Sequence, residues 1–458
     1  MKKTFTKLFS TALFTALTFT GFAVQAQITT ANADASTTVD KTEMSTGASA
    51  KKEVKISTKA ADADTSWKPL RRLWGYTFGD FYYNDHADQG TGVRGAETNY
   101  NGVPTYRNAF QFRRVYLGYD YDITKKFRAE LLLASEPSAN TGVNGATSIQ
   151  NGDNLVDSKM AFYIKNINLR WMNIFNGTDF VIGEMATPGF ALNEAGTNGA
   201  TSLSETTWGY RFIEKTVSDF HRTNSYDVGA SLQGTFDPAT KNFGYVAMIG
   251  NNTQASLSGA ANPNTGFYKI FYGDLWAKFF NKKIVFDIYA DYAQTSPATA
   301  ALGAQSHSVF KAFAAYTTPK LSIGVEAYTQ KLANAVTNTS TPSPEDATVN
   351  AISVWVKGAI VKDKVGFFAR YDGYNPDTQF NTASTYTANS NGFATYNPTV
   401  KETFYTAGLD FTPTKNVHFA PNIWLVNYTD QRNSATTGYV APDHNMVYRL
   451  TFYYVFGK

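Results

Sequence analysis

The chain has 458 residues, of which 15% are aromatic and 17% charged, with a formal net charge of +4 and no cysteine. A mean hydropathy of −0.30 is too low for a helical membrane protein, and the aromatic content is too high for a disordered chain. The small net charge argues against a nucleic-acid binder, and the lack of cysteine excludes disulfides, thiolate metal sites and cysteine nucleophiles.

The first 26 residues have the pattern of a secretory signal peptide. Three lysines precede a short apolar stretch from Leu8 to Val24, and Val24-Gln25-Ala26 is an acceptable cleavage site. We therefore expect an exported protein whose mature chain begins at Gln27.

Residues 27–66 differ in composition from the rest of the chain. They are rich in Ala, Ser, Thr and Lys, and they contain no aromatic residue and no leucine. Such a segment buries too little apolar area to offset the entropy lost on ordering. We expect a flexible periplasmic extension here, followed by one folded domain over 67–458.

From Leu70 onward, apolar and polar residues alternate with the period of two that is typical of β-strands. In the last segment Leu450, Phe452 and Tyr454 alternate with Thr451 and Tyr453, and the segments around residues 115–121, 284–292, 352–357 and 365–372 show the same pattern. No run of apolar residues after residue 26 approaches the roughly 18 needed for a spanning helix.

The connections between these segments alternate in length. Seven are short and polar, at 122–126, 173–178, 237–242, 281–283, 318–320, 362–364 and 413–416. Eight are longer and rich in Asn, Thr, Gly and Ser, at 84–107, 136–157, 187–222, 252–265, 295–306, 331–348, 374–401 and 430–444. Fifteen connections join sixteen strands, with a long connection first and last.

This alternation predicts an all-β fold, a 16-stranded antiparallel transmembrane β-barrel of the outer membrane with short periplasmic turns and long extracellular loops. Closure of the barrel gives every backbone polar group a partner in lipid. The competing interpretation is a water-soluble β-domain with an aromatic core, which gives no reason for the alternation.

Charged residues in the middle of the predicted strands share one face. A lysine or arginine that faces lipid costs about 2–4 kcal/mol, so we expect this face to line the lumen. It carries Arg114, Arg128, Glu130, Arg170, Asp287, Asp291, Lys357, Arg370, Asp372 and Arg449. Lys165 has the same parity as Ile167 and Leu169, which indicates either a bulge there or a different register.

Several short stretches resemble the Bacteroidetes branch of the phosphate-selective porin O and P family. They are Gly75–Tyr83, Phe112–Tyr119, Ile164–Leu169, Ile182–Pro188 and Trp208–Lys215, and the resemblance extends over most of residues 70–458. It implies a sixteen-stranded barrel, a homotrimer, passive uptake of small hydrophilic solutes, and a third long loop, 187–222, that folds inward as a constriction. Members that give the family its name carry a ladder of basic residues for anions, whereas the expected lumen face of this chain mixes both signs.

The inward loop supplies the main candidate site residues. Arg211, Glu214, Lys215, Asp219 and Arg222 lie on or beside it. Opposed charges across a narrow pore set up a transverse field that biases ion traffic. The alternative is that these charges form salt bridges that attach the loop to the wall, and both roles are compatible.

No catalytic or cofactor motif emerges. The five histidines are scattered without metal-ligand spacing, and no G-x-S-x-G elbow is present. Residues 90–95 match G-x-G-x-x-G but lie in a polar loop with no helix after it. We therefore predict no enzyme activity, no cofactor and no metal.

The sequence as a whole predicts an outer-membrane porin for passive diffusion of small hydrophilic solutes or ions, with weak anion selectivity as one option. The alternatives are a transporter of hydrophobic substrates of the fatty-acid type, and a structural or adhesin barrel with a closed lumen. Expected partners are small solutes or anions, outer-membrane lipid, further copies in a homotrimer, and the barrel-insertion machinery, for which the aromatic strand ending at Phe456 resembles the signal.

Overall fold

The computed structural model describes residues 67–88, 100–136, 155–156, 159–160, 162–189, 203–221, 225–251, 268–295, 303–338, 343–382, 386–388, 399–435, 439, 441 and 443–457. These residues belong to one compact unit, Asp64–Lys458. The predicted signal peptide, 1–26, and the predicted extension, 27–66, lie outside them.

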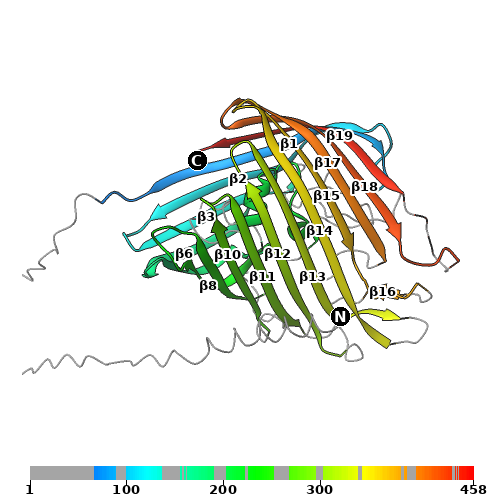
Figure 1. Cartoon of the computed structure of the whole chain (residues 1–458), viewed down its shortest axis with the longest axis horizontal. Coiled ribbons are helices and arrows are strands. Elements are labelled where there is room, and N and C mark those ends of the chain that lie inside the picture. Colours follow the sequence, from blue (N-terminus) through cyan, green and yellow to red (C-terminus); the bar gives the residue numbers. More distant parts are fainter. Residues whose placement is uncertain are drawn as a thin grey trace, which may run out of the picture. The chain divides into compact units, whose positions relative to one another are not determined.

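The described residues form a closed antiparallel barrel of sixteen strands (Figure 1), as the connections predict. The barrel strands are β1 Arg71–His86, β2 Asn108–Asp122, β3 Phe127–Ser135, β6 Tyr163–Phe175, β7 Thr178–Ala186, β8 Tyr226–Thr235, β9 Phe243–Gly250, β10 Ile270–Phe279, β11 Ile284–Thr295, β12 Gln305–Thr317, β13 Leu321–Asn338, β14 Ser343–Val361, β15 Val365–Asn375, β17 Val400–Thr414, β18 Val417–Asp430 and β19 His444–Phe456. Neighbours in sequence pair with each other, and β1 also pairs with β19, which closes the sheet.

Within the described parts of the connections there are five shorter elements. The three-residue strand β16 (Tyr386–Ala388) pairs with the end of β13, and β4 (Leu155–Val156) pairs with β5 (Lys159–Met160). The helices α2 (Leu203–Trp208) and α3 (Val217–His221) belong to the predicted inward loop. Neither of these two described helices is long and apolar enough to cross a membrane.

One rim of the barrel carries the seven short connections, hereafter the short-turn rim, and the other carries the eight remaining connections, hereafter the long-loop rim. The two shortest turns are 176–177, where Gly177 takes a φ of +80°, and 415–416. One prediction needs correction. Most of the expected loop 331–348 is strand, because β13 and β14 continue past the barrel as a long hairpin and only 339–342 connects them.

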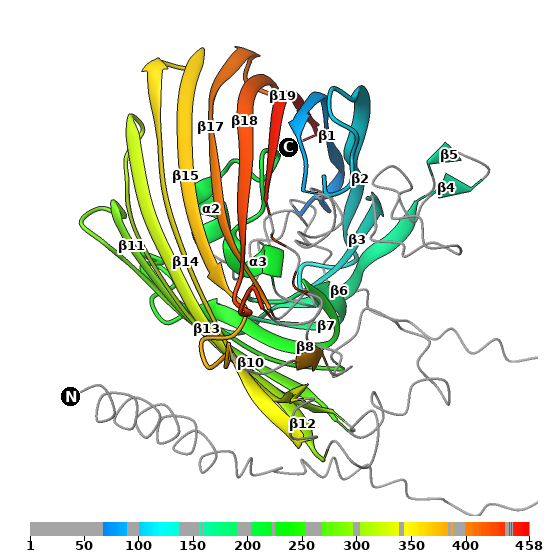
Figure 2. The same ribbon diagram turned by 90° about the vertical axis from the view of Figure 1, so that its right-hand side faces the viewer.

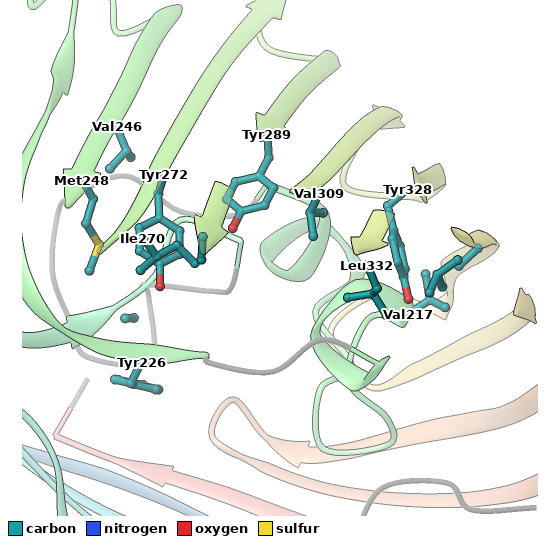
Figure 3. Close-up of a cluster of buried hydrophobic side chains, with 14 of the residues drawn as sticks. Val217, Tyr226, Val246, Met248, Ile270, Tyr272, Tyr289, Val309, Tyr328 and Leu332 are labelled. Carbon is teal, nitrogen blue, oxygen red and sulfur yellow. The ribbon is translucent and has the colours of Figure 1, made fainter. Parts of the chain in front are cut away.

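The two faces of the barrel differ in polarity, as the alternation predicts. On β11 the outward Phe286, Ile288 and Tyr292 are exposed, while the inward Asp287 and Tyr289 are buried. Inward apolar side chains also pack together on β9 to β13, in a cluster that includes Met248, Tyr272, Tyr289, Val309 and Tyr328 (Figure 3). The outside is therefore suited to lipid, and the inside mixes charged, polar and aromatic groups.

A bulge accounts for the parity of Lys165. Across the β3–β6 pair, Leu132 lies opposite Asn166 and Leu133 lies opposite Ile164, so Lys165 is the extra residue of a β-bulge. A bulge re-aims the side chain it carries. Lys165 is accordingly buried, and its ammonium lies 2.7 Å from a carboxylate oxygen of Glu136.

Inward tryptophans lie over glycines of the neighbouring strand. Trp355 is paired with Gly324, and a Cβ added at that glycine would overlap the indole ring. The pairs Trp74–Gly118 and Trp276–Gly244 have the same arrangement. Each glycine therefore makes room for a large ring that lies flat on the inner wall.

We predict that Gly324→Ala destabilises the barrel, because the new methyl group displaces the Trp355 ring. Overpacking of this kind costs about 1–3 kcal/mol. The variant should lose its folded electrophoretic migration at a lower temperature than the parent chain. Gly273→Ala is the matched control, because a Cβ at Gly273 meets nothing within 4 Å. Equal stability of the two variants would show that the ring does not need the glycine.

Candidate functional site

Residues 203–221 of the predicted inward loop lie inside the ring of strands (Figure 2). Its aromatic side chains pack against the inner wall. The ring centroids of Trp208 and Trp355 are 5.8 Å apart, and those of Tyr210 and Phe368 are 4.5 Å apart. Phe212 stacks on Tyr453 at 4.6 Å. The described residues of the loop are therefore packed against the inner wall of the barrel.

Arginines of the wall hold the backbone of this loop by its carbonyl groups. Arg113 of β2 donates to the carbonyl of Phe212, and Arg449 of β19 donates to the carbonyl of Ile213 at 3.0 Å. Arg370 of β15 donates to the carbonyl of Lys215 and binds Asp372 through two nitrogens, at 2.8 and 2.5 Å. These donors come from three separate parts of the wall, so they fix the position of the loop.

Other wall residues, on β11, β13 and β18, complete the attachment. The backbone N–H of Leu203 donates to Asp287 of β11 at 3.2 Å, and that of Ser218 donates to Glu326 of β13 at 3.1 Å. The indole N–H of Trp424 on β18 donates to the Glu214 carboxylate at 2.9 Å. The loop is thus bound to the wall through its backbone and through the side chain of Glu214, one of the predicted site residues.

Arg211 and Asp219 are paired within the loop. The Arg211 guanidinium lies 3.1 Å from Glu205 and 2.8 Å from Asp219. Burial alone would raise the pKa of Asp219, but the cations Arg211 and Lys215 outweigh it and hold this pKa at about 2. Asp219 therefore stays ionised at neutral pH. The predicted site residue Arg222 lies outside the described residues.

The predicted wall residues occupy different levels of the lumen. Arg114 donates to the Tyr116 hydroxyl at 2.9 Å, and Arg170 binds Glu130 at 3.0 Å. Arg128 lies near the short-turn rim, 2.6 Å from Asp122. The ammonium of Lys357 is 5.6 Å from the centre of the Tyr210 ring, which places it beside the loop. Of all the predicted wall residues, Lys357, Arg370, Arg449 and Asp287 lie beside the loop or bond to it.

Sequence reasoning missed one strong pair, Arg113 with Asp80. Their side chains are fully buried and 2.6 Å apart, and Thr451 also donates to Asp80 at 2.6 Å. Arg113 is the extra residue of a bulge, because Phe78 lies opposite Arg114 and Gly79 lies opposite Phe112. The signal was present in the sequence, since two adjacent arginines in one strand cannot both avoid lipid without a bulge.

The wall at β10 to β13 is rich in acidic side chains. Asp274, Asp287, Asp291 and Glu326 point inward from β10, β11 and β13, and Lys311 of β12 lies among them. The Lys311 ammonium is 3.9 Å from Glu326. Within the described residues, the wall at β10 to β13 is therefore mainly acidic, whereas the arginines of β2 and β15 share their strands with buried acids such as Asp120 and Asp372.

We predict that Arg370→Ala loosens the loop. A hydrogen bond to a charged group contributes about 1.5–3 kcal/mol. Its loss should therefore raise, about tenfold or more, the fraction of molecules in which the loop has detached from the wall. The chain has no cysteine, so a Ser218→Cys reporter can be labelled selectively. Ser218 is 1% exposed, and its hydroxyl has no hydrogen-bond partner among the described residues. The rate at which a water-soluble thiol reagent labels the cysteine at position 218 should rise by the same factor.

The matched control is Arg432→Ala. Arg432 binds Asp430 across the same two-residue spacing, with a nitrogen-to-oxygen distance of 2.5 Å, but it lies next to β18 at the long-loop rim. This variant should leave the labelling rate at position 218 unchanged. Equal rates in the Arg370 and Arg432 variants would mean that Arg370 does not anchor the loop.

Comparison with known proteins supports the fold. No protein-family model and no curated protein matches the chain. The outer-membrane channel DcaP of Acinetobacter baumannii is similar in structure, with a TM-score of 0.51 and 7% sequence identity over 85% of this chain and 97% of that chain. The anion-selective porin from Comamonas acidovorans has a TM-score of 0.50 and 11% identity over 85% of this chain and 100% of that chain. Pseudomonas putida OprB has a TM-score of 0.50 and 9% identity over 85% of this chain and 94% of that chain. At these identities the likeness concerns the fold alone. The described chain therefore has the barrel fold of outer-membrane porins.

Proposed function

We propose that this protein is an outer-membrane channel through which small hydrophilic solutes or ions diffuse passively. The observation that carries the proposal is a loop held by charged anchors inside a barrel whose inner wall is rich in ionisable side chains. A lumen lined in this way is suited to water, whereas the outer face is apolar and suited to lipid. The likeness to porin folds supports the same assignment.

The proposed setting follows from the same features. The short-turn rim would face the periplasm and the long-loop rim the outside, after export through the signal peptide 1–26. A homotrimer, insertion by the barrel-insertion machinery and membership in the phosphate-selective porin O and P family remain part of this proposal. The resemblance of the sequence supports each of them.

A second candidate function is a structural barrel with a closed lumen. The packing of Trp208, Tyr210 and Phe212 against Trp355, Phe368 and Tyr453 favours it, because these rings occupy space that a solute would need. The loop is then a plug instead of a constriction. The two candidates agree on the fold and differ in whether ions pass.

Recordings from planar lipid bilayers decide between the two candidates. The channel proposal predicts stepwise ohmic conductance from the purified, folded barrel. A variant in which a glycine–serine linker replaces residues 203–221 should give larger steps. If the parent protein gives no steps and the linker variant does, the loop is a plug and the channel proposal is wrong. If neither conducts while both migrate as folded barrels, passive diffusion is excluded altogether.

The same recordings in a salt gradient give the sign of ion selectivity. We propose a preference for cations in place of the weak anion preference that the sequence left open, because four acids (Asp274, Asp287, Asp291 and Glu326) and one lysine (Lys311) are buried on the inner wall of β10 to β13. Lys311→Gln should shift the reversal potential further toward cations. Lys331→Gln, at an exposed lysine of β13, should not. An anion-selective parent channel would refute the proposed sign.

A further inference from the structure

Three side chains with metal-ligating atoms meet at the long-loop rim, away from the loop inside the lumen. The Nε2 atom of His86 lies 2.5 Å from one oxygen of Asp443, and the Nδ1 atom of His444 lies 2.7 Å from the other. The two imidazole rings stack with their centres 4.3 Å apart. One ligand atom from each of the three residues lies within 4.8 Å of the other two.

Barrel closure brings these residues together. His86 ends β1 and His444 begins β19, the first and last strands, and the two strands pair along the closing seam. The register shifts between Asn84 and His86, so a bulge at Asp85 places His86 opposite Met446. His444 precedes Met446 by two residues, which puts both imidazoles on one face of the pair.

The backbone around Asp443 is held in place before any ligand binds. The N–H of Asp443 donates to a carboxylate oxygen of Asp88 at 3.0 Å, and its carbonyl accepts from the N–H of Tyr428 at 3.0 Å. The N–H of Asp88 in turn donates to the Asn445 side chain at 2.7 Å. The carboxylate therefore sits on a preorganised segment between the two histidines.

The donor set suits a transition metal. Imidazole nitrogens and carboxylate oxygens bind Zn²⁺ at about 2.0–2.2 Å in tetrahedral sites, often with three protein ligands and an open fourth position. All three side chains are partly exposed, which leaves the site accessible to a metal ion from the solvent.

We propose that His86, Asp443 and His444 bind one divalent transition-metal ion, of the type of Zn²⁺, and that this ion cross-links the closing seam of the barrel at its long-loop rim. The site is separate from the loop and does not depend on the proposed channel function. In the metal-bound state the ion replaces the hydrogen bonds that now join the two imidazoles through the carboxylate.

The test is a Zn²⁺ titration of the untagged full-length barrel in detergent, in competition with a chromophoric chelator. The parent protein should bind one ion at this site. His86→Ala and His444→Ala should each weaken binding at least about tenfold, since even the loss of outer-shell partners costs 10–100-fold in metal affinity. Asp443→Asn keeps the size of the side chain and should also weaken binding.

His418→Ala is the matched control, because His418 pairs with Asp410 at 3.0 Å beside the short-turn rim. It removes a histidine from a second His–Asp pair and should leave Zn²⁺ affinity unchanged. Electron paramagnetic resonance of bound Cu²⁺ gives a second readout that needs no variant, with coupling to two imidazole nitrogens expected. Equal affinity in all variants, no measurable Zn²⁺ binding by the parent, or a Cu²⁺ spectrum without nitrogen coupling would overturn the proposal.

Discussion

The structure depends on one constraint, which is that every backbone polar group within lipid needs a hydrogen-bond partner from the protein itself. A single β-sheet meets this requirement only when its first and last strands pair, as β1 and β19 do here. Closure then fixes an inside and an outside for every strand. With a side-chain period of two, each residue in a strand faces either lipid or lumen, and bulges are the places where this order changes.

The same constraint shapes the interior. A loop folded into the lumen buries its own carbonyls and amides, and these also need partners. The inward charges that lipid excludes from the outer face supply them, because Arg113, Arg370 and Arg449 donate to loop carbonyls while Asp287 and Glu326 accept from loop amides. Anchoring the loop and setting the field in the lumen are therefore done by the same side chains.

The strand number and the identity of the outer face could be predicted because they depend on local signals, namely alternation and turn composition. The inward fold of the loop 187–222 was expected only from the family resemblance. The hairpin at 331–348 was misassigned, since its polar composition resembles a loop although β13 and β14 continue through it. The Arg113–Asp80 pair depends on a bulge. His86 and Asp443 are 357 residues apart, and no spacing rule joins residues that only barrel closure brings together.

Accessibility along β19 tests the central claim most directly, because the chain has no cysteine and accepts single spin-labelled cysteines at successive positions. In lipid vesicles, labels at 448, 450, 452 and 454 should collide with oxygen dissolved in the bilayer. Labels at 449, 451 and 453 should be shielded from it. A profile without this two-residue alternation, or with the opposite phase, would contradict a barrel with its apolar face toward lipid.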